Sequence, residues 1–396
     1  MDECPQTSKN RFLVIDYICP IITKIIIKMK NTTIPTLPKF KSAAGSNFSK
    51  ELRANVESYF RKADISKFAN GALKFKAIIL LASFFGAYAL ILFSGWSVWL
   101  IWSLCIFLGF VKAGIGMGLM HDANHGSFSK NRLVNKIFGY TADFLGVSSS
   151  NWINQHNKLH HTYTNIYEHD EDVNGKGLFR FTKDAPRRKM HRFQHIYWTF
   201  FYGFLTLGWF FADISAYSKY RKKGLNKKQG ADKVKEVVTI IFFKLLYVSY
   251  MFILPYIVLD FAFWQVIIGV FSLEFVAGMI LSVIFQMAHV VDKFDLSNHD
   301  KFEGTTKDEW TVHQIHNTFD FAVKNKIITW YCGGLNFQVI HHLFPTISHA
   351  HYPKLYEIVK ETARKHGVNY QEFKTFREAF ISHLVFLKKL GSTQFA

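Results

Sequence analysis

Histidines gather in three short clusters of this chain. The clusters are HDANH at residues 121–125, HNKLHH at 156–161 and QVIHH at 338–342. His121 and His125 are four residues apart, so on a helix both imidazoles project from one face and can hold one metal ion. His156 and His160 repeat that spacing, and His161 points about 100° round the helix, toward a second ion or the opposite side of the same site.

The third cluster has glutamine where the other two begin with histidine. Gln338 precedes the adjacent pair His341 and His342 by three and four residues. A neutral amide oxygen binds a transition metal less strongly than imidazole does, so two interpretations stay open. Gln338 is either a weak oxygen ligand or a hydrogen-bonding group beside the ligands.

Metal binding explains the clusters better than histidines scattered over a basic surface. A structural zinc site needs four ligands and commonly uses thiolates. Here the three clusters hold seven imidazoles, and the four cysteines of the chain form no C-x-x-C pair. Seven nitrogen ligands are enough for two ions with open positions, and two irons suit imidazole and leave room for dioxygen.

Membrane-spanning helices are the elements that must position these clusters. Hydrophobic residues make up 49% of the 396-residue chain and charged residues only 19%, a profile typical of a polytopic membrane protein. Four apolar runs are long enough to cross a bilayer as helices. They are 77–94, 98–120, 237–259 and 264–287. We therefore expect an all-α integral membrane protein whose four spans form two hairpins beside a cytoplasmic, histidine-rich di-metal domain.

Positive charge predicts the orientation of these spans. Neither short hairpin connection contains lysine or arginine, whereas residues 219–235 are densely basic. Basic segments stay cytoplasmic, so both termini and the histidine clusters are assigned to that side. Residues 195–213 are apolar, but a fifth crossing would separate the clusters, so we predict an interfacial helix there. The net charge of +19 favours an anionic membrane surface over nucleic acid as a partner.

Three regions follow from this organisation. They are a cytoplasmic N-terminal segment at 1–74, a catalytic domain at 75–365 and a cytoplasmic C-terminal tail at 366–396. Residues 12–27 are interrupted by Asp16, Pro20 and Lys24 and make a poor span. Because Met29 follows, we hypothesise that residues 1–28 are an extension. The scattered cysteines fit a reducing compartment.

The clusters resemble the three histidine boxes of the membrane fatty acid desaturases. The likeness includes GGLNFQ before the third box and LFP after it, and it covers roughly residues 75–365. The glutamine of the third box resembles the front-end subclass, which places a double bond between an existing one and the carboxyl end of the acyl chain. In that family a histidine near the cytoplasmic end of the last span joins the metal site, and FQMAHVVD puts His289 there.

Several other residues are candidates for supporting roles. Metal-bound imidazoles usually donate their outer N–H to a fixed acceptor. The acceptor candidates are Asp122, Asp170, Glu171 and Asp172, with Asn124 and Asn165 weaker. Asp170 and Asp172 could equally form a solvated acidic loop. His313 and His316 are expected to be structural or to support the ligands. The candidates for an apolar substrate tunnel are Trp152, Phe285, Phe337 and Leu343, although such residues more often form plain core or lipid contacts.

The resemblance also implies the reaction and its partners. Two Fe²⁺ ions would use O₂ to remove two hydrogens from adjacent methylenes of a fatty acyl chain and leave a cis double bond. Electrons must come from a separate donor, cytochrome b5 or a ferredoxin with its reductase, because neither a flavin or nicotinamide fingerprint nor the HPGG haem motif is present. The basic cytoplasmic face would attract an acidic donor.

Two competing functions share some of these features. Another membrane di-iron oxygenase, such as a lipid hydroxylase or a sphingolipid desaturase, would have the same boxes and a different product. A metal transporter or zinc-dependent receptor would place histidines and acids within its spans. Here the boxes flank the spans, and Glu274 is the one acidic exception inside them.

Overall fold

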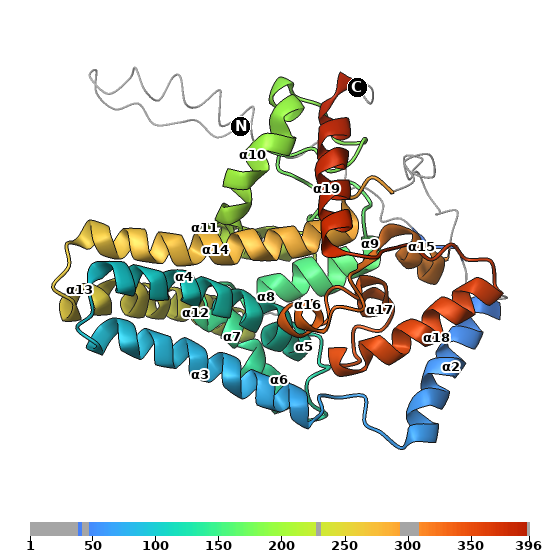
Figure 1. Cartoon of the computed structure of the whole chain (residues 1–396), viewed down its shortest axis with the longest axis horizontal. Coiled ribbons are helices and arrows are strands. Elements are labelled where there is room, and N and C mark those ends of the chain that lie inside the picture. Colours follow the sequence, from blue (N-terminus) through green and yellow to red (C-terminus); the bar gives the residue numbers. More distant parts are fainter. Residues whose placement is uncertain (1–38, 42–46, 227–230, 294–308, 394–396) are drawn as a thin grey trace, which may run out of the picture.

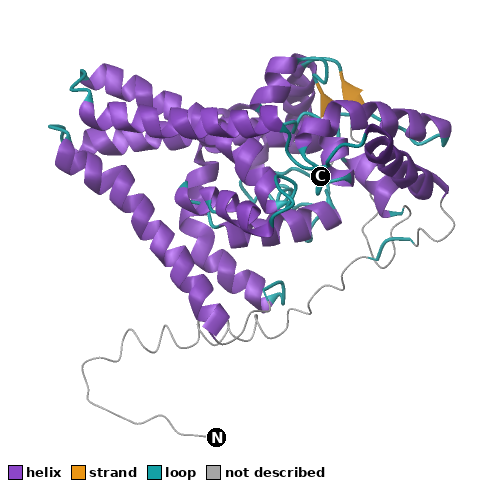
Figure 2. Ribbon diagram, turned by 90° about the horizontal axis from the view of Figure 1, so that it is seen from below, coloured by secondary structure: helices purple, strands orange, loops and turns teal. Residues whose placement is uncertain are grey.

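The computed structural model describes residues 39–41, 47–226, 231–293 and 309–393. Nearly all regular structure in these residues is helical (Figures 1 and 2). The two short strands among them, β1 (Asp320–Phe321) and β2 (Glu372–Phe373), pair in parallel. The proposed extension at residues 1–28 lies outside the described residues.

Within the described residues, four helices are long and apolar enough to cross a membrane. They are Gly71–Phe93, Val98–Asn124, Asp232–Val258 and Phe263–His289. The first is α3 and the last is α14, and both are uninterrupted. The second comprises α4 (Val98–Ile115), η1 (Gly116–Met120) and α5 (His121–Asn124), and the third comprises α12 (Ala231–Val248), η5 (Ser249–Ile253) and α13 (Leu254–Val258). The prediction of an all-α membrane protein with four spans is confirmed.

These helices extend beyond the apolar runs that predicted them. The helix α3 begins at Gly71 rather than near residue 77, because the side chain of Asn70 caps it by accepting from Leu73 N at 3.0 Å. The helix α14 continues to His289. A window of apolar residues finds the lipid-spanning part of a helix and misses its polar end turns, which here carry the functional residues.

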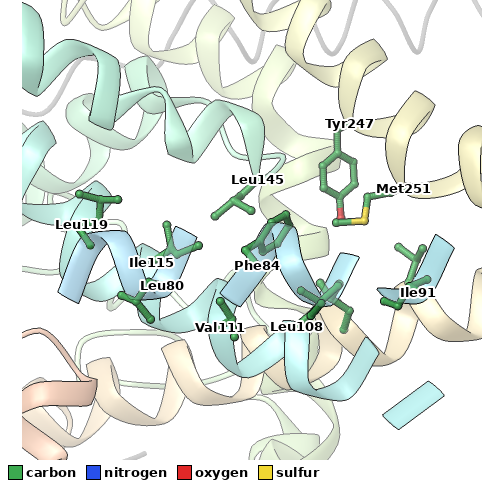
Figure 3. Packing of buried hydrophobic residues seen from close by; sticks show 14 of the residues in the cluster. Leu80, Phe84, Ile91, Leu108, Val111, Ile115, Leu119, Leu145, Tyr247 and Met251 are labelled. Atoms are coloured by element: carbon green, nitrogen blue, oxygen red, sulfur yellow. The ribbon is translucent and has the colours of Figure 1, made fainter. Parts of the chain in front are cut away.

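The four spans pack around one large apolar cluster. It runs as a row of buried side chains from Leu119 through Ile115 to Leu108 and Ile91, with Tyr247 and Met251 beside it (Figure 3). The helices α4 and α14 touch closely at Gly109, where an added Cβ would lie only 2.6 Å from the Leu273 carbonyl oxygen. Glycine is needed there because no other side chain leaves room for the neighbouring backbone.

The outward faces of the spans are apolar. Phe93 is 75% exposed, and Trp99 and Ile257 are each 73% exposed. Trp96 and Trp264 are also exposed beside the two hairpin connections. Exposed apolar faces with aromatic residues at the helix ends are typical of a surface covered by lipid. The protein is therefore a membrane protein.

Short helices gather at the opposite end of the spans, where α4 and α14 end (Figure 1). They are α6 (Arg132–Gly139), α7 (Thr141–Phe144), α8 (Ser149–Trp152), η2 (Ile153–His160), α9 (His161–Tyr163), α15 (Trp310–Asn317), α16 (Lys326–Tyr331), α17 (Gln338–Leu343) and η7 (His349–His351). Beside them α2 (Asn47–Ala63) packs against α18 (Tyr352–Lys365), and Leu52 and Val359 are among the buried residues of that contact.

The segment predicted as an interfacial helix at 195–213 is helical but interrupted. It comprises α10 (Gln194–Phe201), η4 (Tyr202–Phe204) and α11 (Leu205–Lys222), which follow η3 (Lys189–Phe193). At the interruption, a Cβ added to Gly278 of α14 would lie 2.5 Å from the Gly203 carbonyl oxygen. The segment is not among the four candidate spans, and its interfacial position stays a prediction.

The C-terminal residues contribute a packed helix, α19 (Phe376–Gly391). Leu387 and Leu390 are fully buried, and Arg180 Nη1 donates to the Leu390 carbonyl oxygen at 2.9 Å. In Figure 1, α19 stands beside α10 above the end of α14. Most of the region predicted as a tail is thus integrated into the fold.

Candidate di-metal site

Helix ends from distant parts of the chain bring the histidines together. His121 and His125 lie at the end of the second span, and His289 ends α14. The second box lies on η2 and the first residue of α9, and α17 carries the third box. All of the predicted histidine ligands are buried or nearly so. Four separate segments thus meet at one place.

Two groups of imidazoles form there. The first histidine group is His121, His125, His156 and His341, and the second histidine group is His160, His289 and His342. His161 lies between them, because its ligand atom is within 4.8 Å of those of His341 and His342. All seven box histidines and His289 therefore occupy one contiguous cluster.

The nitrogen separations fit ligands of a shared ion. His121 Nε2 lies 3.3 Å from His156 Nε2, and His156 Nε2 lies 3.2 Å from His161 Nε2. In the second group, His160 Nε2 is 3.2 Å from His342 Nε2. Two nitrogens that are each about 2.1 Å from one ion lie roughly 3.0–3.4 Å apart, depending on the angle between them. The observed distances agree with that range.

The backbone of the second box is π-helical, which changes the predicted geometry. The N–H of His161 bonds to the carbonyl oxygen of His156, five residues earlier. This wider turn puts the side chains of His156 and His161 on one side, whereas α-helical spacing predicted His156 and His160 on one face with His161 turned away. The imidazoles of His156 and His160 also stack, and together with Asp172 these two residues form a further set of possible metal ligands.

The outer nitrogen of several imidazoles contacts a fixed partner. His160 Nδ1 donates to Asp170 Oδ2 at 2.9 Å, and His342 Nδ1 lies 2.8 Å from Gln314 Oε1. His341 Nδ1 lies 3.2 Å from the Tyr352 hydroxyl. These contacts leave Nε2 as the nitrogen that faces the cluster, which is the arrangement expected of metal-bound histidine.

Burial keeps most of these imidazoles neutral. Five box histidines have a pKa well below the ordinary value, because burial and the neighbouring imidazoles both disfavour the charged form. These are His125, His156, His161, His341 and His342. His160 differs, because burial lowers its pKa but Asp170 and then Asp172 outweigh burial and raise it. Neutral imidazoles offer lone pairs, so the cluster suits a cation.

Unpartnered buried atoms support the same conclusion. Within the described part of the chain, His125 Nε2, His341 Nε2 and Gln338 Oε1 are buried and have no hydrogen-bond partner. A buried polar atom without a partner costs free energy unless something else satisfies it. Metal ions would satisfy these atoms, and the residues present therefore fit such ions.

An apolar cavity of about 360 Å³ reaches this cluster. This histidine cavity lies between η1, η2, the η4–α11 segment, α14 and the loop at 171–181. His121, His156 and Gln338 form part of its wall, and Trp152 and Phe285 lie beside them. Its walls suit a flexible apolar chain that passes the histidines.

A family comparison agrees with the histidine pattern. A protein-family model described as fatty acid desaturase matches residues 94–374, which is more than half of the chain. The chain belongs to the fatty acid desaturase family. It is a membrane enzyme, an oxidoreductase that acts on fatty acyl chains.

Curated relatives of this desaturase cover nearly its whole length. The sn-1 linoleoyl-lipid 6-desaturase of Arthrospira platensis is 35% identical over 90% of this chain and 96% of the relative. The enzyme of the same description from Synechocystis is 34% identical over 90% of this chain and 99% of the relative. The acyl-lipid (8-3)-desaturase of Physcomitrium patens is 33% identical over 93% of this chain and 76% of the relative.

The predicted carboxylate partners of this desaturase take different positions. Asp170 contacts His160 directly, and Asp172 Oδ2 lies 3.6 Å from the same Nδ1. Burial raises the pKa of Asp172 to about 6. Asp122 Oδ2 lies 2.9 Å from His349 Nδ1, while its other oxygen is 3.9 Å from His121 Nδ1. The carboxylate of Asp122 therefore reaches the cluster mainly through a residue outside the boxes.

Other predicted supporting residues lie further from the cluster. Glu171 pairs with Lys219 at 2.7 Å and accepts from the Tyr220 hydroxyl. His313 Nε2 donates to the Thr164 carbonyl oxygen at 2.9 Å, and His316 is half-buried and outside both histidine groups.

The two weaker amide candidates also lie beside the boxes. Asn165 Nδ2 donates to the His289 carbonyl oxygen at 3.0 Å. The carbonyl oxygen of Asn124 accepts from Asn157 Nδ2. Both contacts hold the backbone next to a ligand.

The four predicted tunnel residues divide into two pairs. Trp152 and Phe285 line the histidine cavity. Phe337 and Leu343 instead belong to the apolar cluster that includes α2 and α18, and they are not among the residues that line the cavity. Phe337 directly precedes the short helix of the third box and Leu343 ends it, so their sequence positions beside the ligands did not determine which way they face.

Sequence reasoning missed three residues that contact the site. They are Gln314, Tyr352 and His349. Gln314 lies on α15 next to His313. His313 was a candidate, but a glutamine side chain carries no sequence signal that marks it as a partner of a metal ligand. Tyr352 and His349 follow the third box at a distance that no motif marks.

Proposed function

We propose that this desaturase is a front-end acyl-lipid desaturase with two iron ions at the two histidine groups. The observation that carries the proposal is a pair of adjacent, buried imidazole groups that open onto an apolar cavity. The proposed ligands are the seven box histidines together with His289. When bound, two Fe²⁺ ions would supply the reduction of O₂ and the removal of hydrogen from two adjacent methylenes.

The protein's own residues hold and orient the reactants. Asp170, Gln314 and Tyr352 fix the outer nitrogens of three ligands, so that each Nε2 faces inward. The histidine cavity excludes water from the acyl chain and places one part of it beside His121 and His156. A narrow apolar wall is what selects one carbon pair from a chain of identical methylenes.

Two further points support the front-end, lipid-linked assignment. Gln338 stands at the start of the third box and its Nε2 lies 3.0 Å from His289 Nε2, so it belongs to the site as a ligand or as a positioning group. Two relatives that cover the chain almost fully are described as acting on a linoleoyl-lipid at position 6. We infer an acyl group esterified in a membrane lipid as substrate.

The sidedness and the electron supply are part of the proposal. The box-bearing helices lie at one end of the spans (Figure 1). The basic end of α11, with Lys219, Arg221, Lys222 and Lys223, lies near the second box, because Lys158 of that box donates to the Leu225 carbonyl oxygen just after α11. This placement favours a cytoplasmic site that receives electrons from an acidic external donor, cytochrome b5 or a ferredoxin with its reductase. Electron transfer that does not weaken with rising salt concentration would contradict the charge-guided docking.

Product analysis tests the proposal. The desaturase is expressed in a host without polyunsaturated acids, linoleic acid is supplied, and the lipids are analysed by gas chromatography with iron content measured on the purified protein. We expect a new double bond on the carboxyl side of the existing ones and two irons per chain. His160→Ala should abolish the product. The matched control His366→Ala should not, because His366 pairs with Glu51 away from the cluster.

Two outcomes would contradict the proposal. Hydroxylated rather than unsaturated products would indicate a lipid hydroxylase. An active His160→Ala variant would remove His160 from the site. Comparing acyl-CoA with phospholipid-bound linoleate in isolated membranes tests the lipid-linked substrate separately.

A further inference from the structure

A second apolar cavity lies, like the histidine cavity, along the contact between the second span (Val98–Asn124) and α14, which we call the seam. This far cavity of about 320 Å³ is lined by Cys105 and Leu108 of α4 and by Gly269 and Leu273 of α14. It sits toward the hairpin end of the spans, away from the histidines. The established site does not use it.

A polar layer separates the two cavities. Lys112 Nζ lies 2.5 Å from Glu274 Oε1, and these side chains are only 5% and 3% exposed. The Tyr247 hydroxyl donates to the same carboxylate oxygen, and Thr206 Oγ1 donates to the Glu274 carbonyl oxygen at 3.0 Å. We call these four residues the charged layer.

The spacing along each helix puts the charged layer between the cavities. On the second span, Leu108 of α4 lines the far cavity, Lys112 follows one turn later, and Gly116 of η1 lines the histidine cavity after one more turn. Residues four apart share a helix face, so all three residues face α14. On α14, Glu274 follows Leu273 of the far cavity and precedes Leu281 of the histidine cavity.

The helices leave little space beside the charged layer. A Cβ added to Gly109 would lie 2.6 Å from the Leu273 carbonyl oxygen and 2.8 Å from Val276 Cβ. A Cβ added to Gly278 would lie 2.5 Å from the Gly203 carbonyl oxygen. With backbones this close on either side of Glu274, an alkyl chain that leaves the histidine cavity along the seam meets the ion pair.

A buried ion pair needs a reason other than stability. Taking two charges out of water costs about as much as their attraction returns, so apolar residues of similar volume would stabilise the fold as well. Ionisable residues inside a membrane-spanning region usually mark function. The site's chemistry uses neither Lys112 nor Glu274.

We propose that the charged layer is the floor of the histidine cavity and limits the length of the acyl chain on its methyl side. The inference rests on the proposed function, in which this cavity holds the acyl chain. The carbons to be desaturated stop beside the histidines, and the remaining methylenes extend toward Gly116 and Leu281 until they meet the ion pair. Longer substrates are excluded because their methyl end would have to displace Lys112 and Glu274.

The test compares a double variant that removes the ion-pair side chains with a control variant that keeps their volume. Lys112→Ala/Glu274→Ala removes both side chains, so neither charge is left without a partner, and it opens space between the two cavities. Lys112→Met/Glu274→Gln removes the charges but retains the volume. Each variant is expressed in the host described above, and linoleic acid is fed together with analogues that are two and four carbons longer at the methyl end. The measured quantity is the ratio of desaturated long acid to desaturated linoleic acid.

The two variants should differ in this ratio. The Ala/Ala variant should raise it about tenfold, the size of effect expected when a pocket gains room for added methylenes. The Met/Gln variant should leave the ratio near that of the wild type. An unchanged ratio in an active Ala/Ala variant would overturn the proposal.

A third variant covers the case in which the Ala/Ala protein does not accumulate in the membrane. Gly116→Val adds side-chain volume just above the floor, where a Cβ would meet only Leu281 at 3.7 Å. It should shift preference toward an acid two carbons shorter, and an unchanged preference would again overturn the proposal. Failure of the wild type to desaturate any of the acids would instead reject the proposed function, so the two failures are distinguishable.

Discussion

The hydrogen bond between Asp170 and His160 gives the sharpest test of the site. The two side chains are completely buried, and Asp170 Oδ2 lies 2.9 Å from His160 Nδ1. The same carboxylate accepts from Asn165 N at 2.8 Å and from Asp172 N at 2.9 Å. Asp170 therefore fixes both the tautomer of a ligand and the loop beside it.

The change Asp170→Asn keeps the shape and removes the charge. An amide has one acceptor oxygen, so its NH₂ must face one of the three donors, and one contact is lost. Asp170 also contributes to the raised pKa of His160, and the same negative charge strengthens the hold of Nε2 on a cation. Losing such a support typically lowers metal affinity by about 10–100-fold. That is roughly 1.4–2.8 kcal/mol of binding free energy.

Metal retention measures this loss directly. Purified wild type and variant are dialysed against a graded series of a chelator, and bound iron is determined at each concentration. Asp170→Asn should release iron at a chelator concentration lower by the predicted factor. The matched control is Glu171→Gln, the same change at the next residue, whose carboxylate contacts Lys219 and Tyr220 instead of a histidine. Equal chelator midpoints for wild type and Asp170→Asn would refute the role of Asp170.

Two further predictions concern buried polar groups. Burial raises the pKa of Asp320 to about 7 from 3.8, although Tyr370 and Val339 donate to it. Its stabilising contribution is thus full below about pH 3.8 and is lost as the pH rises through 7. The thermal midpoint in detergent should fall from pH 5 to pH 8 in the wild type and fall less in Asp320→Asn, and equal slopes would contradict this. Gln338→Ala should lower bound iron from two ions toward one, because Gln338 contacts His289 of the second histidine group. Retention of both ions would remove Gln338 from metal binding.

The sequence predicted the spans and the members of the cluster because both depend on local patterns. Apolar runs of membrane length fix the four helices almost independently of the rest of the fold. The boxes are recognisable because each supplies several imidazoles within one or two turns. His289 required the family resemblance, since a single histidine at a helix end carries no pattern of its own.

The contacts between the boxes could not be predicted in this way. His342 is supported by Gln314 and His341 by Tyr352, and these partners come from α15 and α18, elements whose packing depends on the whole fold. The directions of Phe337 and Leu343 were equally unpredictable. A residue at either end of a six-residue helix that carries ligands can face the cavity or the core, and here both residues belong to the apolar cluster that includes α2 and α18.

The π-helical turns explain why α-helical spacing was an incomplete guide. In both of the first two boxes a histidine N–H bonds to a carbonyl oxygen five residues earlier, His121 to Gly116 and His161 to His156. Such a turn inserts one residue into the α-helical register, so side chains five apart come to share a face. On the second span, the face toward α14 carries Lys112 of α4 and Gly116 of η1, and an uninterrupted α-helix would continue that face at Met120.

Because the π-turn of η1 inserts one residue, His121 rather than Met120 takes the place on the face toward α14. The π-turn of η1 therefore has two effects at once. It lines the histidine cavity with Gly116, Met117 and Met120, and it turns the first ligand toward the place where the acyl chain passes. In an uninterrupted α-helix the angle per residue is fixed. This sequence could then place either the residues that line the cavity or the imidazole of His121 on the face toward α14, but not both.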